Sequence, residues 1–132
     1  MGLNTVRWNH WVAYGSLLAG LAVLAGAFGQ HALETRLPAE RLRIFEVAVR
    51  YHMVHSLAIV MTGLLLRNGP HGLQKAGWAF LTGIVLFSGS LYALCLTDWG
   101  TLGIVTPIGG LAFVLGWTFL AWKFLWNSGS GA

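Results

Sequence analysis

The sequence predicts an all-α membrane protein in which four transmembrane helices form an up-down-up-down bundle. Of its 132 residues, 56% are hydrophobic and 9% are charged, whereas a soluble domain carries roughly 25% charged residues. A chain this short cannot bury so much apolar surface in one water-soluble core. Four apolar runs span approximately residues 11–28, 47–66, 76–96 and 107–126, each close to the ~20 residues that cross a bilayer. We therefore expect one transmembrane domain over residues 1–126, with the lipid bilayer around it.

The first predicted helix has one face made of small residues. They are Gly15, Ala19, Ala22, Gly26 and Gly29. In lipid, such a face allows the backbones of two helices to approach closely. The spacing favours packing within the bundle. The alternative is a free face that pairs with a second copy and makes a homo-oligomer.

The first apolar run also resembles a secretory signal. Arg7 precedes an apolar core, and Ala25-Gly26-Ala27 has the small-x-small pattern of a cleavage site. Two features favour a retained helix instead: the aromatic residues Trp11 and Tyr14 stand at its start, and a discarded peptide has no need of a small-residue face. We expect the run to stay in the protein.

The second helix is predicted to begin with an amphipathic segment after Pro38, a residue that fits the first turn of a helix because its missing N–H has no partner there. Its apolar face carries Leu42, Phe45, Val49 and His52, and its charged face carries Glu40, Arg43, Glu46 and Arg50. We expect this segment to lie partly in the membrane interface. It should run into the second transmembrane helix, either directly or through a bend.

The last two helices have short connections, which force neighbouring helices to run antiparallel. Residues 67–72 (RNGPHG) are typical of a turn, and residues 97–106 form a Gly-containing loop. Predicted packing glycines on these helices are Gly83, Gly89, Gly109 and Gly116. Thr106 is the expected N-cap of the last helix, with Pro107 in its first turn. A cap with close packing is favoured there over an anion site at the helix N-terminus.

The two ends and the charges complete the outline. Residues 127–132 (NSGSGA) are typical of a flexible tail or the remnant of an added linker.

The net charge of +4 does not predict nucleic-acid binding, because the cations stand at the ends of apolar runs rather than on one basic face. Lys and Arg tie between the two membrane sides, with Arg7, Arg67, Lys75 and Lys123 on one and Arg36, Arg41, Arg43 and Arg50 on the other. Because Arg50 belongs to a helix, the balance leans toward cytoplasmic termini.

Five motifs occur in a fixed order along the chain. They are GAFGQHAL at residues 26–33, YHMVH at 51–55, LFSGSLY at 86–92, TPIGG at 106–110 and GW at 116–117. Together they resemble the domain-of-unknown-function family 423, small bacterial inner-membrane proteins with a mitochondrial relative in animals. The resemblance runs from about Gly15 to Trp122 and implies a four-helix fold in the bacterial inner membrane. It implies no reaction, and Gln30 and His52 stand where the family often has Ala and Gln.

A group of polar residues makes the candidate binding site. Its members are His31, Tyr51, His52, His55, Ser88, Ser90, Tyr92 and Thr106. His52 and His55 lie three residues apart on one helical face, and His31 belongs to the loop on the same membrane side. Three imidazoles suit a metal ion or haem. The favoured alternative is hydrogen bonding between helices, and a third is a binding or proton-relay role.

Nothing in the chain matches a hydrolase triad, a Walker loop or a dinucleotide fingerprint, so we expect no enzymatic activity and no obligatory cofactor. The leading hypothesis is a non-enzymatic inner-membrane protein that binds a small molecule, a lipid or a partner through the His31/His52/His55 end. One alternative is an accessory or assembly subunit of a larger membrane complex. Another is a small oligomeric transporter, although the chain has no inverted repeat of the transporter kind.

Overall fold

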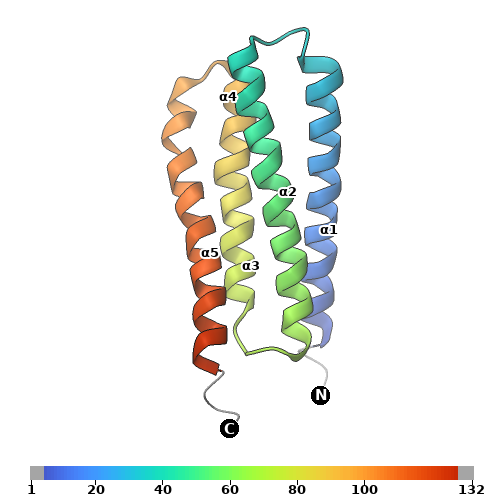
Figure 1. Cartoon of the computed structure of the whole chain (residues 1–132), viewed down its shortest axis with the longest axis vertical. Coiled ribbons are helices and arrows are strands. Elements are labelled where there is room, and N and C mark those ends of the chain that lie inside the picture. Colours follow the sequence, from blue (N-terminus) through green and yellow to red (C-terminus); the bar gives the residue numbers. More distant parts are fainter. Residues whose placement is uncertain (1–4, 128–132) are drawn as a thin grey trace.

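Four long helices stand side by side as a bundle in the computed structural model, which describes residues 5–127 (Figure 1). The segments long and apolar enough to cross a membrane are Trp8–Leu33, Ala39–Asn68, Gln74–Thr97 and Gly100–Trp126. The start of the first helix and the end of the last lie at the same end of the bundle. The predicted fold class is therefore confirmed, and each predicted apolar run lies within one of these segments.

The first helix is longer than predicted. α1 (Thr5–Phe28) continues without a break into a π-helical turn, η1 (Gly29–Leu33), closed by a 3.1 Å hydrogen bond from the Glu34 N–H to the Gly29 carbonyl. The prediction that His31 lies in a loop is wrong. The helix ends at Leu33, and residues 34–37 form a turn before Pro38, whose ring disfavours helical conformation in the preceding residue. His31 thus belongs to the helix that crosses the membrane.

The second helix begins where the sequence predicts and contains no break. α2 (Ala39–Asn68) has 30 residues, about 45 Å at 1.5 Å per residue, which exceeds the ~30 Å of hydrocarbon. Pro38 directly precedes it, and its carbonyl accepts the Leu42 N–H at 3.0 Å. Along the amphipathic start, Phe45 is buried while Glu46 and Arg50 are exposed. The charged first turns account for the length beyond the hydrocarbon.

The third membrane segment is one helix with a π-helical turn in its middle. α3 (Gln74–Gly83), η2 (Ile84–Ser88) and α4 (Gly89–Thr97) follow one another without a gap. The turn that joins α2 to α3 includes Gly72 at φ +91°, a left-handed conformation that glycine adopts at little cost. The predicted turn at residues 67–72 therefore overlaps the last residues of α2 and the short connection after them.

The connection to the last helix is ordered by contacts with α2. α4 ends at Thr97, and the next residue, Asp98, has a left-handed backbone (φ 61°) and forms an ion pair with Arg41. The Cys95 thiol lies 3.3 Å from the Arg41 carbonyl. A 3-10 helix, η3 (Gly100–Ile104), then leads into α5 (Thr106–Asn127), so the predicted loop is partly helical. The start of α2 and the end of α4 are thereby fixed to each other.

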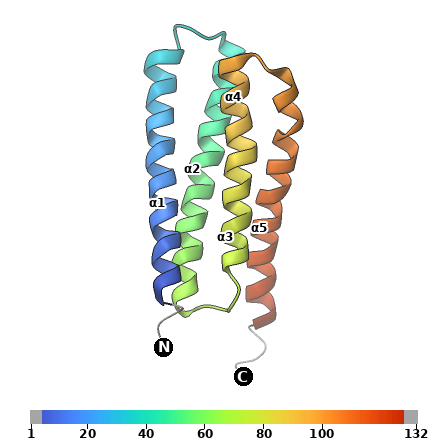
Figure 2. The same ribbon diagram turned by 180° about the vertical axis from the view of Figure 1, so that it is seen from behind.

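α1 packs chiefly against α2, through its small-residue face. A Cβ added at Gly15 would lie 2.7 Å from Val60, and one at Gly29 would lie 2.9 Å from the Phe45 ring. Ala22 is fully buried on the same face. Seen from behind, α1 again lies beside α2 at one edge of the molecule (Figure 2). The face expected to pack either within the bundle or between copies is occupied by the chain's own second helix.

Three of the four packing glycines predicted on the last two helices lie where α3, η2 and α5 meet. Gly83 contacts the Phe113 ring, Gly109 contacts the backbone of Phe87, and a Cβ at Gly116 would lie 2.6 Å from the Phe80 ring. Gly89 is the exception, since a Cβ there would meet only a carbonyl of its own helix at 3.8 Å. The π-helical turn before Gly89 holds extra residues and so changes which face follows it.

α5 includes Asn127, the first residue of the predicted tail. The remaining tail residues, 128–132, lie outside the described part of the chain, as do residues 1–4 at the start of the predicted domain.

Candidate functional site

His55 lies in the centre of the bundle with both ring nitrogens hydrogen-bonded. Its Nδ1 is 2.8 Å from the Tyr51 carbonyl, which can only accept, so Nδ1 carries the proton. Nε2 is then free to accept the Trp117 indole N–H at 3.1 Å. These two contacts fix a neutral imidazole. No lone pair of this ring is left for a metal ion.

Aromatic rings surround His55. The imidazole stacks on Phe113 with a centroid distance of 3.5 Å and an interplanar angle of 12°. The neighbouring rings are Tyr51, Phe80 and Trp117. The sequence analysis did not assign Trp117 to the polar cluster, although it belongs to the GW motif at residues 116–117. Its indole N–H was the available signal, because a donor within a membrane-spanning helix has no water to bond to and needs an acceptor in the protein.

His52 has a different environment. Its Nδ1 lies 3.1 Å from the Tyr92 hydroxyl on α4, but its buried Nε2 has no hydrogen-bond partner among the described residues. The side chain is only 7% exposed. An unpaired buried polar atom typically costs about 1–3 kcal/mol. His52 therefore contributes one bond between helices and carries one unsatisfied atom.

The serines join the third segment to its neighbours. Ser88 donates to the Ala48 carbonyl of α2 at 2.8 Å, and the Ser90 and Thr106 hydroxyls lie 2.7 Å apart between α4 and α5. Thr106 is the first residue of α5 rather than its N-cap, and the carbonyl that accepts the first N–H groups of α5 belongs to Val105. The Thr106 hydroxyl is directed at Ser90, because α4 and α5 lie next to each other at this point. Hydrogen bonds between helices, the favoured alternative for this cluster, thus account for Ser88, Ser90, Tyr92 and Thr106.

The three histidines do not converge. His52 contacts α4 and His55 contacts α5, while His31 is exposed on η1. Over residues 5–127, the structure contains no group of three metal-ligating side chains. The sequence spacing suggested a shared face for His52 and His55, but their rings turn to different neighbouring helices. His31 belongs to another surface of the molecule.

That surface is a groove between α1 and α2. It has a volume of about 500 Å³, and its apolar lining is Ala22, Val23, Gly26, Ala27, Val49, Met53 and Val54. Gln30, His31 and Arg50 provide its polar lining. A smaller hollow of about 220 Å³ shares Gly26, Gln30, Val49 and Arg50 and adds Glu46. The groove therefore changes from apolar to polar along the helices.

Arg50 is the charged group of this groove and has no ion-pair partner within the described region, where Arg41 and Asp98 form the one ion pair. It lies twelve residues into α2 and is exposed. The long side chain can extend its guanidinium to the membrane interface while its methylenes stay in apolar surroundings. Its N–H groups remain available to an anionic or carbonyl acceptor.

Comparison with known proteins gives a consistent set of relatives. A family profile described as "Protein of unknown function (DUF423)" matches residues 25–110. The UPF0382 membrane protein YwdK of Bacillus subtilis is 41% identical over 112 residues, which cover 83% of this chain and 91% of the relative. A UPF0382 membrane protein of Staphylococcus epidermidis is 44% identical over 110 residues, covering 83% and 90%. No solved structure matches the chain.

Proposed function

Since the chain belongs to the DUF423 family of membrane proteins, for which no function is known, we propose that it is a non-enzymatic protein of the bacterial cytoplasmic membrane that binds a lipid in the groove between α1 and α2. The observation that carries this proposal is the order of side chains along the groove. Its apolar part, around Ala22 and Val54, is followed by Gln30, His31 and Arg50. An acyl chain followed by a polar headgroup has the same order.

The position of the groove in the membrane supports this proposal. The excess length of α2 lies at its charged N-terminal end, so residues near Arg50 lie close to the boundary between hydrocarbon and headgroups. Ala22 and Val54 lie deeper by several residues. A lipid in the groove would place its chain against the apolar lining and its phosphate or ester oxygens beside Arg50.

The buried cluster has a structural role in this proposal. Both nitrogens of His55 are bonded within the bundle, and His52 bonds to Tyr92. This revises the sequence-based hypothesis, which assigned binding to His31, His52 and His55 together. Only His31 lines the groove.

The other functions considered from the sequence have no specific observation in their favour. An accessory subunit needs a free packing face, and the small-residue face of α1 contacts α2. A partner helix could fill the same groove in place of a lipid, so the test must distinguish the two occupants.

Native mass spectrometry of the purified protein tests the proposal. We expect a bound lipid in the wild type and its loss in Ala27→Trp, which fills the groove with an indole. Leu24→Trp is the matched control, because Leu24 is 66% exposed on α1 and does not line the groove. Arg50→Gln should weaken lipid retention without abolishing it, since the apolar lining remains.

Three results would contradict lipid binding: a wild type without lipid, equal retention in Ala27→Trp and Leu24→Trp, or a stoichiometric protein partner that is lost only in Ala27→Trp. The last result would assign the groove to a partner helix. Circular dichroism of each variant establishes that the helices are formed.

A further inference from the structure

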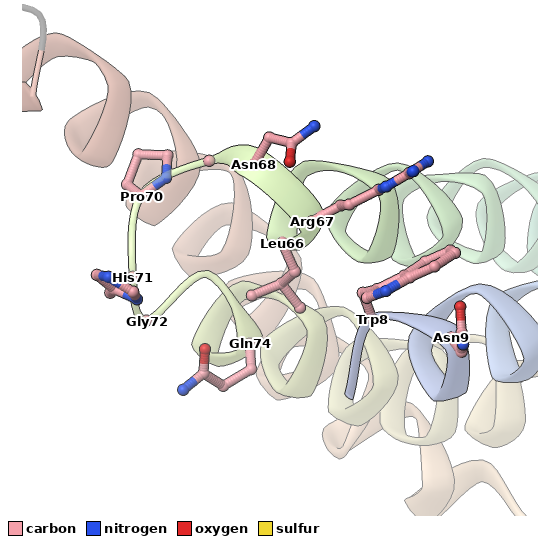
Figure 3. Close-up of a pocket in the computed structure, with 10 residues that line it drawn as sticks. Trp8, Asn9, Leu66, Arg67, Asn68, Pro70, His71, Gly72 and Gln74 are labelled. Carbon is pink, nitrogen blue, oxygen red and sulfur yellow. The ribbon is translucent and has the colours of Figure 1, made fainter. Parts of the chain in front are cut away.

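A second pocket lies at the opposite end of the bundle, where α2 ends and α3 begins. Its volume is about 530 Å³, and it is lined by Trp8, Asn9, Leu66, Arg67, Asn68, Gly69, Pro70, His71, Gly72 and Gln74. Figure 3 shows Trp8 and Arg67 close together on one side and His71 on the other. Half of the lining residues have polar side chains, whereas the α1–α2 groove is mainly apolar.

Arg67 is held in place by an aromatic ring. Its guanidinium carbon lies 5.5 Å from the centroid of the Trp8 ring, a cation–π distance. A cation–π contact uses a face of the planar guanidinium, and the N–H groups at its edges can donate two hydrogen bonds to one oxyanion. No protein acceptor for these N–H groups is found in the described part of the chain.

The other polar side chains of the pocket are also unoccupied. Asn9, Asn68, His71 and Gln74 form no side-chain hydrogen bond with any described residue. Each side chain can donate to an oxygen acceptor. The pocket thus combines one fixed cation with several unused neutral donors.

The charge distribution favours an anionic ligand. The chain has four acidic residues, and all of them belong to the opposite end, at Glu34, Glu40, Glu46 and Asp98 (Figure 1). The end with the pocket carries Arg67, Lys75 and Lys123, and none of the four acidic side chains is there to neutralise them. Lys and Arg side chains at a membrane surface attract anionic headgroups.

We propose that this pocket binds a phosphate group, with Arg67 as its principal ligand and Asn68, His71 and Gln74 as further donors. The site is distinct from the groove between α1 and α2 and lies at the other membrane surface. The phosphate can belong to the headgroup of an anionic lipid or to a free phosphate anion. Both sources present the same oxygens to Arg67.

Binding to the full-length protein in neutral detergent tests this proposal. The probes are phosphatidylglycerol, phosphatidylcholine of the same chain length, and inorganic phosphate, each followed by the shift in thermal unfolding temperature and by native mass spectrometry. We expect Arg67→Gln to bind the anionic probe that the wild type binds, phosphatidylglycerol or inorganic phosphate, about tenfold more weakly than the wild type does, as for loss of a charged hydrogen bond. Arg67→Lys keeps the charge and should give an intermediate loss.

Two control variants separate the pocket from general surface charge. Arg36→Gln removes an exposed cation at the opposite end, and Lys75→Gln removes an exposed cation at the same end that is not part of the pocket lining. Both should bind almost as tightly as the wild type. A selective response to phosphatidylglycerol identifies a lipid headgroup, and an Arg67-dependent response to inorganic phosphate identifies a free anion.

The proposal is overturned if no probe binds, if Arg67→Gln binds like the wild type, or if Lys75→Gln loses as much affinity as Arg67→Gln. Unfolding of each variant without ligand shows whether its fold is retained. Ala27→Trp separates this site from the groove, since it should lose the groove lipid and keep the phosphate response.

Discussion

His52 and His55 are three residues apart on α2, but their rings form hydrogen bonds to different helices. His55 connects α2 to α5 through Trp117 and stacks on Phe113. His52 connects α2 to α4 through Tyr92 and keeps one nitrogen unpaired. In lipid, water is absent, so the stability contributed by each histidine depends on how completely its own ring is satisfied.

Replacing His55 should therefore destabilise the protein. His55→Phe preserves a ring against Phe113 but leaves the Trp117 N–H without an acceptor, at a cost of about 1–3 kcal/mol. Trp117→Phe in the same chain removes the unpaired donor. The double variant should thus lose less than the sum of the single losses, measured as free energies of unfolding in detergent. Additive losses would show that the bond contributes little.

For the pair of His52 and Tyr92, we expect the double variant to recover nearly all of the stability lost in the single variant. Tyr92→Phe leaves both His52 nitrogens unpaired and should cost about 1–3 kcal/mol. His52→Leu with Tyr92→Phe removes the whole pair, including the unsatisfied Nε2, and should stay within about 1 kcal/mol of the wild type. A double variant as unstable as His55→Phe would refute this interpretation. Thermal unfolding of all variants in one detergent provides the comparison.

Among helices, the contact between α1 and α2 depends on the absence of side chains. A Cβ at Gly15 would lie 2.7 Å from Val60 and 2.8 Å from the Ser56 carbonyl, whereas a Cβ at Gly20 would meet nothing within 4 Å. Both glycines belong to the same helix. They form a matched pair in which only the environment differs.

Gly15→Ala should separate α1 from α2 and destabilise the protein by about 1–3 kcal/mol, as overpacking does elsewhere. Gly20→Ala should stabilise it by about 0.5–1 kcal/mol, because alanine lowers the conformational entropy of the unfolded chain. The unfolding temperatures of the two variants should therefore shift in opposite directions. Equal shifts would mean that the small-residue face does not set the distance between the helices.

The helices could be predicted because hydropathy and length act locally, and Pro38 marks the start of α2 without reference to the rest of the chain. The small-residue face of α1 could also be predicted from the sequence, since the spacing of its residues repeats along one helix. The helix that packs against this face could not be predicted, because the choice between α2 and a second copy of the chain depends on how the helices are arranged in space. The structure shows Val60 and Phe45 against that face.

The candidate site was harder to predict than the fold. The sequence spacing put His52 and His55 on one face. It could not show that Trp117, 62 residues away from His55, donates its indole N–H to Nε2 of His55. The loop assignment of His31 failed because η1 extends the helix by a π-helical turn, which hydropathy does not detect. The groove between α1 and α2 combines residues from two elements, so neither run of sequence reveals it alone.

At the scale of the whole molecule, the two ends differ in their acidic residues. Lys and Arg are equal in number at the two ends, but Arg41 is paired with Asp98, and Arg50 is the twelfth residue of α2, farther from a helix end than Arg67 or Lys75. Those two cations are less able to hold their end in the cytoplasm than Arg67, Lys75 and Lys123. The end that carries the termini should therefore face the cytoplasm.

Reporter fusions to the C-terminus test this orientation. A green fluorescent protein fused there should be fluorescent, and an alkaline phosphatase fused there should be inactive. Fusions within the connection between α1 and α2 should give the reverse result. An active phosphatase at the C-terminus would place the cationic end outside and move the phosphate pocket to the external surface.

The close association of α1 with α2 also bears on how the protein is made. Because α1 packs chiefly on α2 and the two are joined by a short connection, most of its contacts are with the helix synthesised directly after it. The first helical hairpin can thus acquire its native pairing in the membrane before the ribosome has completed α5. Biogenesis of this protein is then a sequence of additions to an existing pair, with the aromatic contacts around His55 completed last.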